Sequence, residues 1–148
     1  MLYNYLYTCN NFCYQAKGDN AKIALNKAED IIKKYPNSSA YPAFIYSKML
    51  YHITKNEFSE ALLYSDQGIT MAGKENQKML LQMFYFNKYD ILSKQNRLGD
   101  AKQILLNILG DRLLINDASN KKTVYQQLSL ICEKMSDYKE ALNWSRRY

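Results

Sequence analysis

Asn96-Arg97-Leu98-Gly99-Asp100-Ala101-Lys102 is the stretch that decides the fold, because two related stretches flank it at equal distances. They are Asn56-Glu57-Phe58-Ser59-Glu60-Ala61-Leu62 and Ser136-Asp137-Tyr138-Lys139-Glu140-Ala141-Leu142. Each stretch combines a polar turn, a large side chain, an acidic residue and an alanine. The common step of about 40 residues lies within the roughly 20 to 50 residues typical of repeat proteins, whose units bury their apolar faces against their neighbours. The spacing therefore predicts a repeated helical hairpin.

The composition favours long helices joined by tight turns. The 148 residues are 47% hydrophobic and 23% charged, and they include only two prolines and five glycines. A proline inside a helix costs about 3 kcal/mol and a glycine about 1 kcal/mol, so their scarcity favours helices. The length suits one domain with a continuous core. We therefore expect an all-α fold in a single domain of residues 1–148.

Periodicity and stop signals predict eight helices in four antiparallel hairpins. The expected helices span about residues 2–17, 20–35, 40–55, 57–72, 75–94, 97–114, 120–135 and 137–148. The expected hairpins span about residues 2–36, 39–73, 75–114 and 119–148. Pro36 should end the second helix, and Asn56 should be the N-cap of the fourth. Because the last hairpin has a short second helix, we expect the chain to be part of a longer array.

The alanines and the large residues before them resemble the tetratricopeptide repeat (TPR). In that repeat a small residue opens the contact made by the second helix, which is matched by Ala61, Ala101 and Ala141 and, more loosely and at a slightly shorter step, by Ala24. A large residue three positions earlier packs between hairpins, which is matched by Phe58, Leu98 and Tyr138. The resemblance implies a right-handed superhelical solenoid of antiparallel helix pairs.

Two further features of the repeat qualify the resemblance. The period of about 40 residues is longer than the standard TPR length of about 34 residues. It is similar to the long-repeat variety found in the sensor arms of bacterial transcription activators and histidine kinases. The second small position of the repeat falls on Gly68 in one hairpin and on the larger Ile108 in the next.

The resemblance also implies which residues face the concave groove of the solenoid. The inner-face positions of the repeat fall on Ala43, Tyr46, Leu50, Thr54, Met83, Phe86, Asp90, Lys94, Thr123, Gln126, Leu130 and Glu133. The candidate partner-binding residues among them are Tyr46, Leu50, Met83, Phe86, Asp90, Lys94, Gln126 and Leu130. This mixture of aromatic, apolar and a few charged groups suits a peptide or a helix. The alternative is that these side chains only pack between repeats or between copies of the chain.

The distribution of charge argues against a nucleic-acid partner. The net charge is +6 and the isoelectric point is about 9.1. The basic residues nevertheless occur singly or in pairs such as Lys33-Lys34, Lys121-Lys122 and Arg146-Arg147. Phosphate binding needs clustered Lys and Arg, so we expect a protein or peptide partner instead. No segment approaches the roughly 18 apolar residues of a membrane span, so we expect no membrane contact from this segment.

The chain offers few residues for chemistry. His52 is the only histidine and has no evident orienting partner in the sequence. Cys9 and Cys13 share a helix face, but tetrahedral zinc needs about four ligands. The adjacent carboxylates of Glu29 and Asp30 point about 100° apart and do not converge on one substrate atom. We expect no metal, no cofactor and no enzymatic activity.

Three cysteines, an odd number, favour a reducing compartment over a disulfide-stapled secreted domain. We therefore expect a cytoplasmic location, or a periplasmic one if the segment belongs to a membrane-bound sensor.

These patterns predict a non-catalytic protein–protein interaction module that binds a peptide or helix of its partner in the concave groove. The alternative is a sensory or regulatory TPR arm of a larger bacterial signalling protein, such as a histidine kinase or a transcription regulator. In that case a ligand or partner would change the curvature of the array. Exposed repeat ends could also pair two copies into a homo-oligomer.

Overall fold

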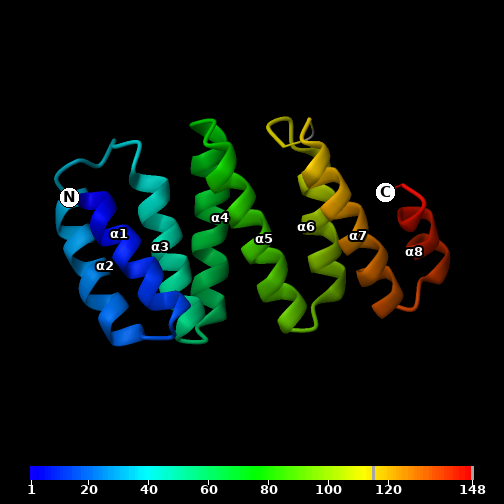
Figure 1. Cartoon of the computed structure of the whole chain (residues 1–148), viewed down its shortest axis with the longest axis horizontal. Helices are drawn as coiled ribbons and strands as arrows, with labels where there is room; N and C mark the ends of the chain where they lie inside the picture. The colour runs from blue at the N-terminus through cyan, green and yellow to red at the C-terminus, as the bar shows by residue number, and fades with distance from the viewer. Residues whose placement is uncertain (115, 148) are drawn as a thin grey trace. The chain divides into compact units, whose positions relative to one another are not determined.

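The described part of the chain is entirely helical between its turns. The computed structural model describes residues 1–114 and 116–147. Within these residues it contains no strand, and its helices are α1 (Leu2–Tyr14), α2 (Gly18–Ile32), α3 (Tyr41–Thr54), α4 (Phe58–Lys74), α5 (Lys78–Lys94), α6 (Leu98–Gly110), α7 (Ala118–Lys134) and α8 (Tyr138–Ser145) (Figure 1). The all-α class and the eight helices expected from the sequence are confirmed.

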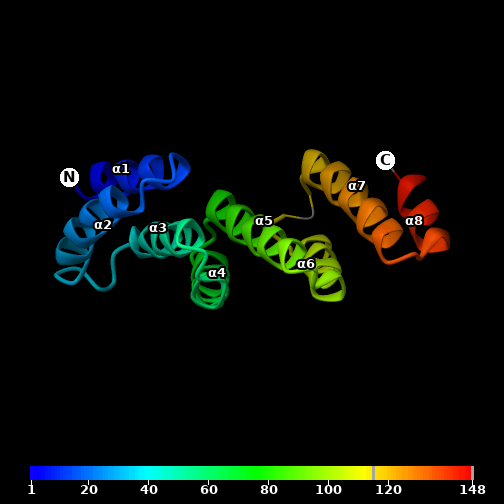
Figure 2. The same cartoon turned by 90° about the horizontal axis from the view of Figure 1, so that it is seen from below.

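The helices fall into two compact units, Met1–Phe84 and Tyr85–Tyr148, and the division lies inside α5. In the first unit α1 packs against α2, α3 packs against both, and α4 packs against α3. In the second unit α7 packs against α6 and α8, and Figure 2 shows α7 and α8 joined by a short turn. Each unit has its own buried core, which includes Phe44 and Met49 in the first and Leu105 and Leu128 in the second.

In the described part of the chain, five turns close with a residue in the left-handed backbone conformation. Their φ angles are between 56° and 63°, and the residues are Ala16, Asn56, Asn76, Asn96 and Ser136. At each turn the next amide donates to the carbonyl five residues before it, as Glu57 does to His52 at 2.9 Å. This 6→1 hydrogen bond is the Schellman motif, which satisfies carbonyls that a helix end leaves without partners. Successive turn residues are 20 residues apart between Asn56, Asn76 and Asn96, and 40 residues apart between Ala16 and Asn56 and between Asn96 and Ser136.

These turns correct the role predicted for Asn56. The N-cap of α4 is Glu57, which makes no side-chain capping hydrogen bond, whereas Asn56 ends α3 in the left-handed conformation. Asparagine serves both purposes, because its short polar side chain suits N-caps and also tolerates positive φ.

The turn after α2 departs from the pattern at Pro36. The pyrrolidine ring fixes φ at a negative value and removes the amide hydrogen, so a proline cannot take the left-handed position. The chain instead makes three short-range bonds, from Tyr35 to Ile32, from Ser38 to Tyr35 and from Tyr41 to Ser38, at 2.9 to 3.0 Å. The prediction that α2 ends before Pro36 is confirmed.

The alanine register extends through all four hairpins at equal steps. Ala21, Ala61, Ala101 and Ala141 are buried, and each donates its amide to the carbonyl four residues earlier at 2.9 to 3.0 Å. The structure thus places Ala21, and not Ala24, at the position equivalent to Ala61. Ala24 is also buried, but it lies nearly one helical turn further along α2.

The large residue expected three positions before each alanine differs in exposure from one hairpin to the next. Phe58 and Leu98 are half-buried, whereas Tyr138 is 69% exposed at the first position of α8. In the first hairpin this position holds Gly18. Because no large residue precedes Ala21, the sequence pattern assigned the contact to Ala24 instead.

Gly68 lets α5 approach α4 closely in the first unit. A Cβ atom built on Gly68 would lie 2.2 Å from the ring of Phe84, which is fully buried. Real Cβ atoms essentially never come this close to a ring, so any side chain at position 68 displaces Phe84.

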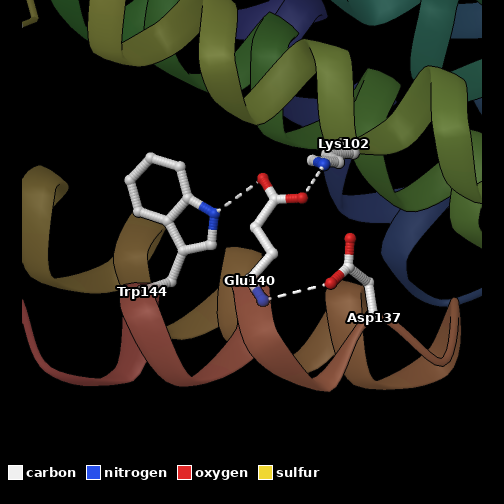
Figure 3. A network of polar contacts seen from close by, with 4 residues as sticks. All are labelled: Lys102, Asp137, Glu140 and Trp144. Atoms are coloured by element: carbon white, nitrogen blue, oxygen red, sulfur yellow. Dashed lines mark hydrogen bonds and ion pairs between the residues drawn. The ribbon is translucent and has the colours of Figure 1, made fainter.

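In the second unit a polar network joins α6 to α8 (Figure 3). The Lys102 ammonium lies 2.5 Å from Oε2 of Glu140, and the Trp144 indole donates to Oε1 of the same carboxylate at 3.2 Å. Asp137 accepts the amide hydrogen of Glu140 at 3.1 Å and so caps α8. The hydrogen bond to Glu140 raises the pKa of Lys102.

Replacing Gly68 by Ala should destabilise the first unit by about 1 to 3 kcal/mol, because the added methyl group displaces the Phe84 ring. The matched control is Gly99→Ala, where no described atom beyond the neighbouring residues and the backbone of α6 lies within 4 Å of the new Cβ. That change should leave stability unchanged or raise it by up to about 1 kcal/mol through helix propensity. Urea unfolding followed by circular dichroism measures both, and a Gly68→Ala variant as stable as the parent would contradict the close packing.

Replacing Ala16 by Gly should stabilise the chain by up to about 1 kcal/mol, because positive φ costs an alanine roughly 1 to 2 kcal/mol that glycine avoids. Ala16→Val should do the opposite, since a β-branched residue tolerates positive φ least. Thermal unfolding of the pair measures the two effects. Equal melting temperatures for both variants would show that the left-handed turn is wrongly placed.

Candidate functional site

The first unit contains a hollow of about 430 Å³ formed by side chains of α1, α3 and α5. We call it the tyrosine hollow, and its lining consists of Tyr3, Asn4, Leu6, Tyr7, Asn10, Tyr14, Ala43, Tyr46, Leu80 and Met83. Ligand sites in proteins commonly measure about 300 to 1,000 Å³ and combine apolar walls with a few polar groups. The volume and the lining therefore suit a binding site.

A stripe of side chains on α1 forms one wall of the hollow. Tyr3, Tyr7, Asn10 and Tyr14 follow one another at steps of four, three and four residues, which places them on one face of the helix. Tyr3 is 60% exposed, Tyr7 71% and Tyr14 66%. The adjacent face of α1 is buried through Leu6, Cys9 and Cys13. The helix is thus held by its core face and presents tyrosine rings to solvent.

The hollow is held in shape by direct contacts between its walls. Tyr46 is only 4% exposed, and its ring meets the Phe84 ring edge to face at 5.5 Å. Its hydroxyl lies 3.3 Å from the hydroxyl of Tyr14. The Ser47 hydroxyl donates to Oδ1 of Asn10 at 2.7 Å, which ties α3 to α1. These bonds exist before any ligand binds, so the site is preorganised.

The structure brings some of the predicted partner-binding residues together in this hollow. Tyr46 and Met83 line it, as does the inner-face residue Ala43. Leu50 is buried and does not line it. Thr54 donates its hydroxyl to the carbonyl of Leu50 at 3.0 Å.

The other predicted partner-binding residues lie in the second unit. Phe86 and Gln126 are half-buried, and Asp90, Lys94 and Leu130 are exposed. Protein atoms around the Asp90 carboxyl desolvate it and raise its pKa, and the positive charge of Lys94 opposes this shift. Asp90 and Lys94 on α5 and Leu130 on α7 are therefore accessible to a partner.

Residues of α1 are the part of the site that sequence reasoning missed. Moving back by one full repeat from Ala43, Tyr46, Leu50 and Thr54 leads to Tyr3, Leu6, Asn10 and Tyr14. All four of these α1 residues line the hollow. The repeat itself was therefore sufficient to find them, and the assignment of Ala24 in place of Ala21 obscured it.

His52 has an acidic partner that the sequence did not lead us to expect. Its Nδ1 atom lies 2.6 Å from Oε2 of Glu57, and its ring stacks on Tyr64 at 5.3 Å. Glu57 is five residues further along and returns to His52 across the turn that Asn56 closes. His52 is not part of the lining of the tyrosine hollow.

The cysteines are buried in both units. The hydrogen bond between Cys9 and Cys13, followed by burial, raises the pKa of the Cys9 thiol, whereas the same bond lowers the pKa of Cys13 to about 7. Burial raises the pKa of Cys132. Among the described residues no group of three or more His, Cys, Asp or Glu side chains could hold a metal ion. In the same part of the chain no helix has the length and apolar character needed to cross a membrane.

No protein-family model, curated protein or solved structure matches the chain.

The three thiols should react with Ellman's reagent at least about tenfold more slowly in the native chain than in urea, because all three are buried. Cys13 should react first in the native chain, because it is 8% exposed whereas Cys9 and Cys132 are fully buried, and because the hydrogen bond with Cys9 lowers its pKa. Mass spectrometry of the partly labelled chain identifies the order. Native labelling of Cys9 or Cys132 at the rate seen in urea would contradict the packing of α1 or α7.

Proposed function

We propose that the chain is a non-catalytic protein-interaction module that binds a segment of a partner protein in the tyrosine hollow. The observation that carries this proposal is the row of three exposed tyrosines on one face of α1, above the buried Tyr46. Tyrosine is enriched among the residues that contribute most to protein interfaces, because it supplies a rigid ring and a hydroxyl at a small entropic cost. Isolated exposed aromatics need no explanation, but a row of them along one helix face does.

We also propose that the hairpins form a TPR-like right-handed solenoid. The support is the common register of the four hairpins. The buried alanines are equally spaced along the sequence, and the left-handed turn residues are separated by the same spacing or by half of it. Consecutive repeats with the same internal geometry generate a regular superhelix, whose inner face is the usual binding surface. Under this proposal Phe86, Asp90, Lys94, Gln126 and Leu130 are inner-face residues of the later hairpins.

The proposal is tested by selecting binders from a random peptide library displayed on phage, with the purified chain as target. Peptides that occupy the hollow should bind the double variant Tyr7→Ala, Tyr14→Ala at least about tenfold more weakly, because truncating an anchor tyrosine commonly costs about 2 kcal/mol or more. Fluorescence polarisation measures the dissociation constants, and circular dichroism checks that helicity is retained.

The matched control is the double variant Tyr35→Ala, Tyr138→Ala, which removes two similarly exposed tyrosines outside the hollow. It should bind the selected peptides as the parent does. The proposal fails if the library yields no binder, or if the selected peptides bind both double variants equally well.

A further inference from the structure

None of the described residues that line the tyrosine hollow is charged, although 23% of the chain is charged. Of these ten lining residues, four are tyrosines, two are asparagines and four are apolar. A charged group that entered the hollow would lose hydration without gaining an ionic partner, which is costly. Charge complementarity therefore favours an uncharged occupant.

The polar groups of the hollow can donate hydrogen bonds. Tyr3 and Tyr7 each carry a hydroxyl, whereas the Tyr14 hydroxyl already pairs with that of Tyr46. The Oδ1 atom of Asn10 accepts a hydrogen bond from Ser47, so its NH₂ group is the part of the amide that can serve a ligand. An occupant that carries carbonyl acceptors fits these donors best.

A polyproline II segment offers such acceptors. It has no internal hydrogen bonds, so its carbonyls are free, and a proline has no N–H that would need an acceptor in the hollow. An α-helix instead satisfies its carbonyls internally, and burying the tyrosine and asparagine donors under its apolar face would leave them without partners. The hydrogen-bond donors of the hollow therefore favour a polyproline II segment over an α-helix.

The spacing of the tyrosines also fits a polyproline II helix. Tyr7 and Tyr14 are seven residues apart on α1, which corresponds to about 10 Å along the helix axis. One turn of polyproline II contains three residues and rises about 9 Å. From Tyr3 to Tyr14 the wall is about 16 Å long, enough for about five residues of such a segment.

We propose that the tyrosine hollow binds an uncharged, proline-rich segment in the polyproline II conformation, with prolines three residues apart stacked on Tyr7 and Tyr14. This inference rests on the proposed function and specifies its partner. Aromatic-lined grooves are a general solution for such segments, because the preformed extended conformation loses little entropy on binding.

The inference is tested with the full chain and three synthetic uncharged peptides of equal length. The first is acetyl-(Pro-Pro-Ala)₃-amide, the second is a flexible peptide of Gly and Ser, and the third is an Ala- and Gln-rich helix former. A fourth peptide, acetyl-(Pro-Pro-Glu)₃-amide, tests the exclusion of charge. Isothermal titration calorimetry should give a dissociation constant for the first peptide at least tenfold lower than for each of the others.

The binding of the first peptide should weaken at least tenfold in the Tyr7→Ala, Tyr14→Ala variant and remain unchanged in Tyr35→Ala. Tyr7→Phe, Tyr14→Phe should weaken it by an intermediate factor, because the rings remain and the hydroxyl donors are lost. This variant also keeps the packing area, so its circular dichroism spectrum should match that of the parent.

Two outcomes would overturn the inference: the Gly-Ser, helical or Pro-Pro-Glu peptide binds as tightly as the first, or the first binds the Tyr7→Ala, Tyr14→Ala variant unchanged. If the helical peptide binds and depends on Tyr7 and Tyr14, the polyproline inference fails and the proposed function stands. If binding of every peptide, including those selected from the library, is independent of these tyrosines, both fail.

Discussion

The left-handed turn with its 6→1 hydrogen bond is the interaction on which the rest of the structure depends. It ends one helix and starts the next within a few residues, so α2, α4, α6 and α8 each begin two residues after a left-handed residue. One additional residue would rotate the following helix by about 100° and carry its alanine away from the contact. The constant turn is thus the reason that Ala21, Ala61, Ala101 and Ala141 occupy the same place in four hairpins.

Much of the fold could be predicted from the sequence because its signals are local. The alanine spacing and Pro36 are visible without knowledge of the packing, and they locate the hairpins and the end of α2. The function of Asn56 could not be read in the same way, since asparagine suits an N-cap and a left-handed turn alike. The register of the first hairpin was missed because Gly18 replaces the large residue that precedes the alanine elsewhere.

The candidate site could also be predicted only where local sequence signals are enough. The helical period places Ala43, Tyr46 and Met83 on faces that meet at the hollow, and they line it. Whether a residue is accessible depends on its neighbours. Leu50 is buried, and Tyr46 is only 4% exposed because its ring packs edge to face against Phe84. Gly68 makes that arrangement possible by admitting Phe84 against α4, so a residue without a side chain helps to shape a site that it does not line.

The backbone conformation at the five turns is the most direct test of the common register. Backbone NMR chemical shifts and three-bond amide couplings report φ in solution, and hydrogen exchange reports whether the following amides are bonded. We predict positive φ at Ala16, Asn56, Asn76, Asn96 and Ser136, with protected amides at Lys17, Glu57, Gln77, Arg97 and Asp137. Negative φ at these positions, or left-handed residues at other spacings, would contradict the constant step from which the hairpins and the hollow follow.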